Sequence, residues 1–247
     1  MGEIRVGTSG WSYPSWRGDF YPPGLVQRRE LSYLAERVDS VEINGSFYSL
    51  QRPTSYRKWR EATPDGFVLA VKGGRFITHL KRLREVADPI ARFFGSGLDE
   101  LGPKLGPVLW QLPATLTYDR ALLADFYDAL PRKVGTWPVR HVLEFRDASF
   151  CTDEALDQMR AHDIGCVVSD SPGTWPRAEA VTSDVVYVRL HGHTELYASG
   201  YAPASLDQWA ERCRGWAEEA DVYVYFDNDA RGRAPYDAMG LRARLRQ

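Results

Sequence analysis

The chain has 247 residues, a net charge of −2, 44% hydrophobic residues and 26% charged residues. These values are those of an ordinary folded protein, and they exclude a strongly basic chain that is attracted as a whole to nucleic acid or acidic membranes. Its three cysteines are too few and too scattered for a disulfide framework, and no CxxC pair indicates a structural zinc site. We therefore expect a cytoplasmic protein with reduced thiols, no signal peptide and no membrane-spanning segment.

Short apolar segments predict eight β-strands, and the stretches between them are mostly helical. In chain order the strands are expected at Ile4–Ser9, Ser40–Asn44, Phe67–Lys72, Val108–Leu112, Val139–Arg146, Gly165–Asp170, Val185–His191 and Val222–Asp227. The helices are expected at Leu31–Val38, Pro53–Ala62, Ala121–Leu130, Thr152–His162, Ser205–Glu219 and Pro235–Leu245. Alternating βα units in a chain of this length predict an α/β fold, namely a closed parallel (β/α)8 TIM-like barrel that forms one domain over residues 1–247. An open doubly wound sheet is the alternative, but the segment after the first strand, GTSGWSYPSW, lacks the GxGxxG pattern that such a sheet would need.

Polar side chains recur near the C-terminal ends of these strands, on the face expected to line the barrel. Successive side chains of a strand point to opposite faces, so Tyr187, Arg189 and His191 share one face. The same alternation predicts that the interior face also carries Glu42, Asn44, Lys72, Gln111, Glu144, Arg146 and Asp170. The last strand is ambiguous, because Asp227 and Asn228 lie on opposite faces. Since the C-terminal ends of barrel strands meet at the mouth where barrel enzymes carry their active sites, we expect the functional site there.

The charges at this mouth are balanced, with Glu42, Glu144 and Asp170 set against Lys72, Arg146 and Arg189. A divalent metal site concentrates carboxylates and imidazoles without several competing cations, so a metal is not favoured. If a metal binds, its expected ligands are Glu144, Asp170 and His191. His191 and His193 also form an HxH pair, a weak metal motif, and no cofactor is identified from the sequence.

Three functions are compatible with this pattern. The first is an enzyme for a phosphate- or carboxylate-bearing substrate, for example a hydrolase or phosphodiesterase acting on nucleic acid or a nucleotide. In this enzyme the anion would be bound by Lys72, Arg146 and Arg189. Protons would be transferred by Glu42, Glu144 or His191, and these groups would be oriented by Asp170 and Asn44. The second is a sugar-processing enzyme that uses Glu42 and Glu144 as paired carboxylates. The third is a protein that binds a small anion or nucleic acid without catalysis. For any single charged residue a purely structural ion pair is an alternative of comparable weight.

Several neutral side chains are expected to complete the binding site. Trp11 and Tyr48 lie in loops that would overhang the mouth, where their rings could stack on a base or a sugar. Gln111 and Asn228 are expected to bind substrate through their amides. The basic run from Arg75 to Arg84 is interpreted as a solvated helix face, and Cys166 as inert core.

Eight segments, in this order, resemble the DUF72 family, also called YecE-like proteins: GTSGWSYPSWRGDFYP, VEINGSFY, FVLAVKGGRFITH, LGPVLWQLP, VLEFRDASF, VVSDSP, VYVRLHG and VYVYFDND. The resemblance covers essentially the whole chain. It implies a TIM-barrel-like fold but no particular activity. Two positions depart from the family pattern, because Gly45-Ser46 replaces the usual Ser-Thr and Asp227 replaces the first residue of a usual Asn-Asn pair. An acceptor-only carboxylate at position 227 would change any ligand contact that an asparagine makes there.

Overall fold

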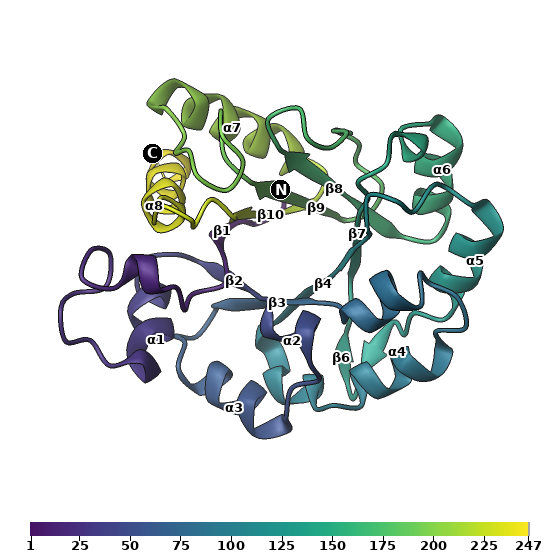
Figure 1. Ribbon diagram of the computed structural model, residues 1–247, viewed down its shortest axis with the longest axis horizontal. Helices are drawn as coiled ribbons and strands as arrows, with labels where there is room; N and C mark the ends of the chain where they lie inside the picture. The colour runs from purple at the N-terminus through teal and green to yellow at the C-terminus, as the bar shows by residue number, and fades with distance from the viewer. Residues whose placement is uncertain (247) are drawn as a thin grey trace.

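The computed structural model describes residues 1–246, and its centre is a closed barrel of eight parallel strands (Figure 1). Neighbouring strands follow chain order around the barrel, and β10 pairs with β1 to close it. The barrel strands are β1 (Ile4–Ser9), β2 (Ser40–Ile43), β3 (Val68–Lys72), β4 (Leu105–Gln111), β7 (His141–Glu144), β8 (Ile164–Asp170), β9 (Val185–Leu190) and β10 (Asp221–Phe226). The predicted TIM-like α/β barrel is therefore confirmed.

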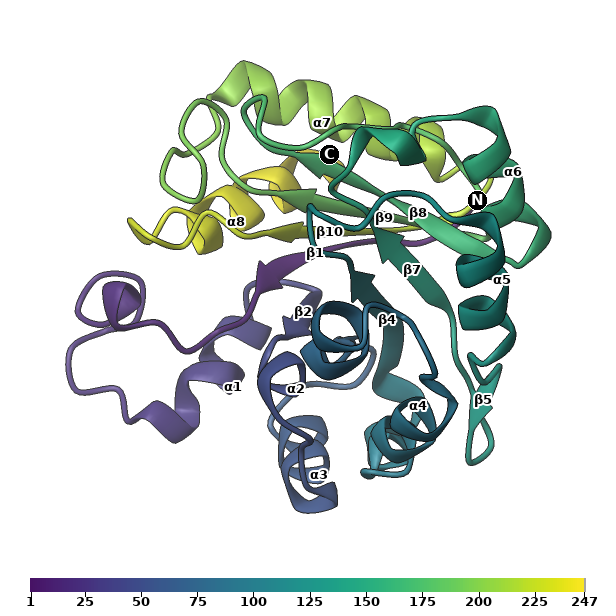
Figure 2. The ribbon, with the colours of Figure 1, turned by 45° about the vertical axis from the view of Figure 1, so that its right-hand side comes forward.

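Helices surround the barrel on its outside (Figures 1 and 2). They are α1 (Glu30–Ala35), α2 (Gly45–Tyr48), α3 (Pro53–Glu61), α4 (Ala87–Phe94), α5 (Arg120–Asp128), α6 (Asp153–Ala161), α7 (Pro203–Trp216) and α8 (Ala234–Leu245). Local sequence explains where several of these helices begin. The side chains of Asp119 and Thr152 accept backbone N–H groups as N-caps of α5 and α6. Pro53 and Pro203 occupy the first turns of α3 and α7. No helix within residues 1–246 is both long and apolar enough to cross a membrane.

Shorter elements occupy the connections. The 3-10 helices are η1 (Pro14–Trp16), η2 (Gln27–Arg29), η4 (Leu98–Lys104) and η5 (Ala148–Phe150), and η3 (Phe76–Leu80) is a π-helix. An antiparallel hairpin that the sequence pattern does not predict, β5 (Lys133–Val134) with β6 (Trp137–Pro138), precedes β7. The strand expected at Val139–Arg146 is shorter in the structure, where β7 covers only His141–Glu144. The first of these connections, residues 10–29, leaves the barrel beyond the C-terminal end of β1 (Figure 2).

The barrel has two separate apolar layers. A large cluster lies between the strands and the helices, and a smaller one fills the interior, where it includes Val68, Ala70, Leu109, Val142, Val167, Tyr187, Tyr223 and Tyr225. This packed interior closes the N-terminal part of the barrel, so the interior side chains that follow it along each strand are the ones that reach the C-terminal mouth.

The interior layer corrects one predicted strand face. In β8 the interior side chain is Val167, which pairs in register with Tyr187, whereas Cys166 and Val168 belong to the outer cluster. Asp170 has the parity of Cys166 and Val168, so it does not lie on the interior face as expected. The alternation alone was insufficient here because both faces of β8 are apolar and buried.

Candidate functional site

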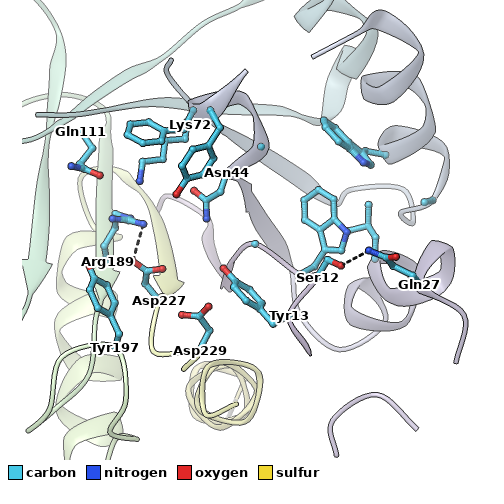
Figure 3. Close-up of a pocket in the computed structure, with 18 of the residues that line it drawn as sticks. Ser12, Tyr13, Gln27, Asn44, Lys72, Gln111, Arg189, Tyr197, Asp227 and Asp229 are labelled. Atoms are coloured by element: carbon cyan, nitrogen blue, oxygen red, sulfur yellow. Dashed lines mark hydrogen bonds and ion pairs between the residues drawn. The ribbon is translucent and has the colours of Figure 1, made fainter. Parts of the chain in front are cut away.

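A cleft of about 1120 Å³ opens at the C-terminal ends of the barrel strands. Figure 3 shows Lys72, Gln111, Arg189, Asp227 and Tyr197 on one side of it and Ser12 and Gln27 on the other, with Asn44 and Tyr13 between them. The polar lining includes Lys72, Gln111, Arg146, Arg189, Asp227 and Asp229, and the aromatic lining includes Trp11, Tyr13, Phe47, Tyr48 and Trp59. Seven of the predicted site residues thus line one cavity, namely Trp11, Asn44, Tyr48, Lys72, Gln111, Arg146 and Arg189.

Arg189 is the centre of a buried ion-pair network below the cleft. Its guanidinium is 1% exposed and contacts three carboxylates: Glu42 at 2.9 and 3.1 Å, Glu144 at 2.8 Å and Asp227 at 3.1 Å. Nη2 also donates to the Ser9 hydroxyl at 3.0 Å. Burial opposes ionisation of all these groups, but the mutual attraction outweighs it, so the pKa values of Glu144 and Asp227 fall well below their usual range and the pKa of Arg189 rises.

Every carboxylate oxygen of Glu42 and Glu144 accepts a hydrogen bond within this network. Tyr187 donates its hydroxyl to Glu42 Oε2 at 2.7 Å, and Ser9 donates to Oε1 at the same distance. Arg146 donates to Glu144 Oε1 at 3.2 and 3.3 Å. Both glutamates are 0% exposed and neither lines the cleft. Their arrangement is that of counter-ions that hold Arg189 in place.

His191 lies beneath the cleft and completes the network. Its Nδ1 is 2.9 Å from Asp227 Oδ2, and its Nε2 is 3.5 Å from Glu144 Oε1, with no hydrogen-bond partner among residues 1–246. Trp175 and Tyr197 pack edge-on against the imidazole. His193 points elsewhere, toward the Ser205 hydroxyl, so the HxH pair does not converge on one point.

Lys72 differs from the other cations at the mouth. It ends β3 on the interior face and is only 9% exposed, yet within the described chain Nζ makes no hydrogen bond and lies within 4 Å of no carboxylate. The ammonium instead lies over the Phe47 ring, 4.6 Å from its centroid. Burial, and next the charge of Arg189, lower the pKa of Lys72 to about 8.

Arg146 is the second cation that borders the cleft. Its guanidinium stacks on Trp175, 3.6 Å from the ring centroid, and Nε and Nη2 hold Glu144. Nη1 has no hydrogen-bond partner among residues 1–246. The stacking and the ion pair fix the plane of the group, so that Nη1 is presented at a defined position.

Three further polar side chains, Asn44, Tyr13 and Asp229, line the same cleft. Asn44 donates through Nδ2 to Ser9, while its buried Oδ1 has no partner in the described chain. Tyr13 donates its hydroxyl to the Ser9 carbonyl. Burial, and next the charge of Asp227, raise the pKa of Asp229 to about 6, which brings this carboxyl into the range useful for proton transfer at neutral pH.

The aromatic wall comes from two of the predicted stacking residues and two further ones. Trp11 meets Trp59 edge-to-face with ring centroids 5.5 Å apart, and Phe47 meets Tyr48 in the same way at 5.1 Å. Tyr48 is 70% exposed, so its ring is free to contact a ligand at the rim.

The structure does not bring the remaining predicted residues into the cleft. Asp170 instead binds Arg177 at 3.1 Å and accepts the Tyr201 hydroxyl at 2.8 Å. Asn228 faces away from the barrel and donates to the Ser199 carbonyl and to Asp237. Glu144, Asp170 and His191 are therefore not arranged as a ligand set, and nowhere in residues 1–246 do three or more His, Cys, Asp or Glu side chains form a group that could hold a metal ion.

Sequence reasoning missed several residues of the site. Ser9 is central to the network but carries no charge, although its position at the end of β1 could have suggested it. Tyr13, Tyr197 and Asp229 reach the cleft from loops, where strand alternation gives no prediction. Asp227 does lie on the interior face, on the side of Tyr223 and Tyr225, which resolves the ambiguity of the last strand.

Comparisons with known proteins agree with this architecture. The family model described as "Protein of unknown function DUF72" matches residues 5–247. The UPF0759 protein YunF of Bacillus subtilis is 25% identical over 94% of this chain and 90% of its own length, and the UPF0759 protein YecE of Escherichia coli is 32% identical over 52% of this chain and 44% of its own length. A DUF72 family crystal structure from Thermotoga maritima superposes with a TM-score of 0.84 at 25% identity, covering 99% of this chain and all of that one. A DUF72 family crystal structure from Enterococcus faecalis superposes with a TM-score of 0.82 at 20% identity, covering 99% of this chain and 96% of that one. The chain belongs to the DUF72 family.

Proposed function

We propose that this protein is an enzyme that acts on a small anionic substrate, carboxylate- or phosphate-bearing, in the cleft at the barrel mouth. Lys72 and Arg146 bind the anion, and Asp229 transfers protons. The hydrolase or phosphodiesterase version of this proposal stays a prediction.

The observation that carries the proposal is the contrast between two buried lysines. Lys104 is 8% exposed, and its Nζ donates to the Arg60 carbonyl and to the Thr63 carbonyl and hydroxyl, at 2.8, 2.6 and 3.2 Å. Lys72 is 9% exposed and has no such acceptor within the described chain. A buried ammonium without an acceptor is costly, and an anion in the cleft would supply the missing partner.

The charge arrangement supports the same conclusion. Arg189 is neutralised by the three carboxylates around it, so among the cations that the described strand ends bring to the cleft, Lys72 and Arg146 have N–H groups left over for a ligand. The sugar-processing alternative needs two carboxylates free to act on a glycosidic bond, whereas Glu42 and Glu144 both bind the guanidinium of Arg189.

Titration calorimetry with inorganic phosphate tests this proposal. We expect the wild-type protein to bind phosphate at pH 7. Arg146→Gln should raise the dissociation constant for phosphate about tenfold or more, because one charge-assisted hydrogen bond is lost. Arg57→Gln is the matched control, since Arg57 pairs with Glu100 on the surface outside the cleft and its loss should leave phosphate binding unchanged. Equal weakening in both variants, or no binding by the wild type, would contradict the proposal.

A further inference from the structure

We propose that the amine of Lys72 forms a covalent imine with a carbonyl carbon of the substrate, so that the substrates of this cleft are anionic aldehydes or ketones such as 2-oxo acids or phosphorylated carbonyl compounds. This inference rests on the proposed function, because the anion of the substrate stays on Arg146 while the carbonyl meets Lys72.

The surroundings of Lys72 are those of a reactive amine. An amine that is bonded to carboxylates remains protonated and cannot attack a carbonyl, but within residues 1–246 no carboxylate lies within 4 Å of Nζ. Its contact is instead the face of Phe47, and Nζ borders the open cleft. Desolvation beside another cation is one of the ways in which enzymes activate a lysine nucleophile. With a pKa of about 8, roughly one-tenth of the amine is neutral at pH 7.

The use of lysine at this position supports the inference. The chain has 26 arginines and only five lysines. An arginine would bind a carboxylate or phosphate with two parallel hydrogen bonds and would keep its charge, so it suits anion binding alone better than lysine does. What lysine offers and arginine does not is a nitrogen that can lose its proton and form a carbon–nitrogen bond.

The chemical step is balanced by groups at the cleft. The neutral Nζ attacks the carbonyl carbon, a C–N bond forms, and the π electrons of the C=O bond move to oxygen, which takes up a proton. The nitrogen loses one proton, and the hydroxyl leaves as water after a second protonation, which gives the protonated imine. Asp229, which borders the same cleft, can exchange these protons with solvent.

Reductive trapping tests the imine directly. The protein is incubated at pH 7 with glyoxylate, a carboxylate-bearing aldehyde, and sodium cyanoborohydride, which reduces an imine to a stable secondary amine. Peptide mass spectrometry then locates the adduct among Lys58, Lys72, Lys81, Lys104 and Lys133. We expect Lys72 to be labelled about tenfold faster than the exposed Lys133, because far more of its amine is neutral at pH 7 than in an ordinary lysine side chain.

Three controls separate this inference from the proposed function. Propanal, a neutral aldehyde, should label Lys72 with much less preference, and phosphate should protect Lys72 from glyoxylate. Lys72→Arg should still bind phosphate but give no rapid adduct. Phosphate binding without preferential labelling of Lys72 would overturn the imine and leave the proposed function standing. Preferential labelling that phosphate does not reduce would support the reactive amine and contradict the anion site.

Discussion

An Arg189→Met variant is expected to lose about 3–5 kcal/mol of the free energy of unfolding at pH 7, measured by urea denaturation. The guanidinium is the shared partner of Glu42 and Glu144, which are fully buried, and of Asp227, which borders the cleft and is 15% exposed. Removing one partner of a buried ion pair leaves uncompensated charge in a medium of low polarity, and that loss far exceeds the net value of the pair itself.

The pH dependence of this variant gives the destabilisation a specific cause. Without Arg189 the carboxylates lose the attraction that lowers the pKa of Glu144 and Asp227, and burial then raises their folded-state pKa values above those of the unfolded chain. The variant should therefore regain stability as the pH falls from 7 toward 5, because the folded state takes up protons there. Arg57→Met is the control, and its exposed pair with Glu100 should cost less than about 1 kcal/mol at either pH. A loss at Arg189 no larger than this control would show that the network is not ionised.

A Lys72→Met variant is expected to change stability in the opposite direction, becoming about 1–3 kcal/mol more stable than the wild type at pH 7. Methionine has a similar volume and needs no hydration, whereas the ammonium has no acceptor in its buried position. The same variant should bind phosphate at least tenfold more weakly. A gain in stability together with a loss of binding is the pattern expected of a residue kept for function.

The sign of the pH effect follows from the shift in the pKa of Lys72. Its folded-state pKa is about 8 and its ordinary value is 10.5, so between these values the unfolded chain binds more protons than the folded one. Wild-type stability should then rise across this window relative to Lys72→Met, and the difference between the two proteins should shrink toward pH 10.5. The control is Lys81→Met, a half-exposed lysine paired with Glu85 on the surface, whose effect on stability should be small. If Lys72→Met is instead less stable than the wild type at pH 7, Lys72 is a structural counter-ion of the carboxylates.

The barrel and its interior rows could be predicted from sequence because strand alternation is a strict geometric rule. It places Glu42, Lys72, Glu144 and Arg189 on the inner face, where the structure has them. It fails at Asp170, because both faces of β8 are apolar and only pairing with β9 sets which one points inward.

The division of labour within the site could not be predicted in the same way. Alternation treats Arg189 and Lys72 alike, as cations on the inner face. In the structure the Arg189 guanidinium lies about 3 Å from carboxylate oxygens that neutralise it, whereas the Lys72 ammonium has no acceptor within residues 1–246. The contacts of each cation depend on the length and conformation of its side chain, and the rest of the cleft depends on the loops that carry Tyr13 and Asp229. Neither follows from a periodic pattern.

The most direct test of the account is an NMR titration of the lysine side chains. With only five lysines, 13C-labelled Cε signals can be assigned by substituting Lys72, and their pKa values can be measured with and without phosphate. We expect one lysine, Lys72, to titrate near pH 8 in the free protein and to move upward when phosphate binds, because the anion stabilises the ammonium. If Lys72 titrates near 10.5, or does not respond to phosphate, it is not the buried cation that binds an anionic substrate in this cleft.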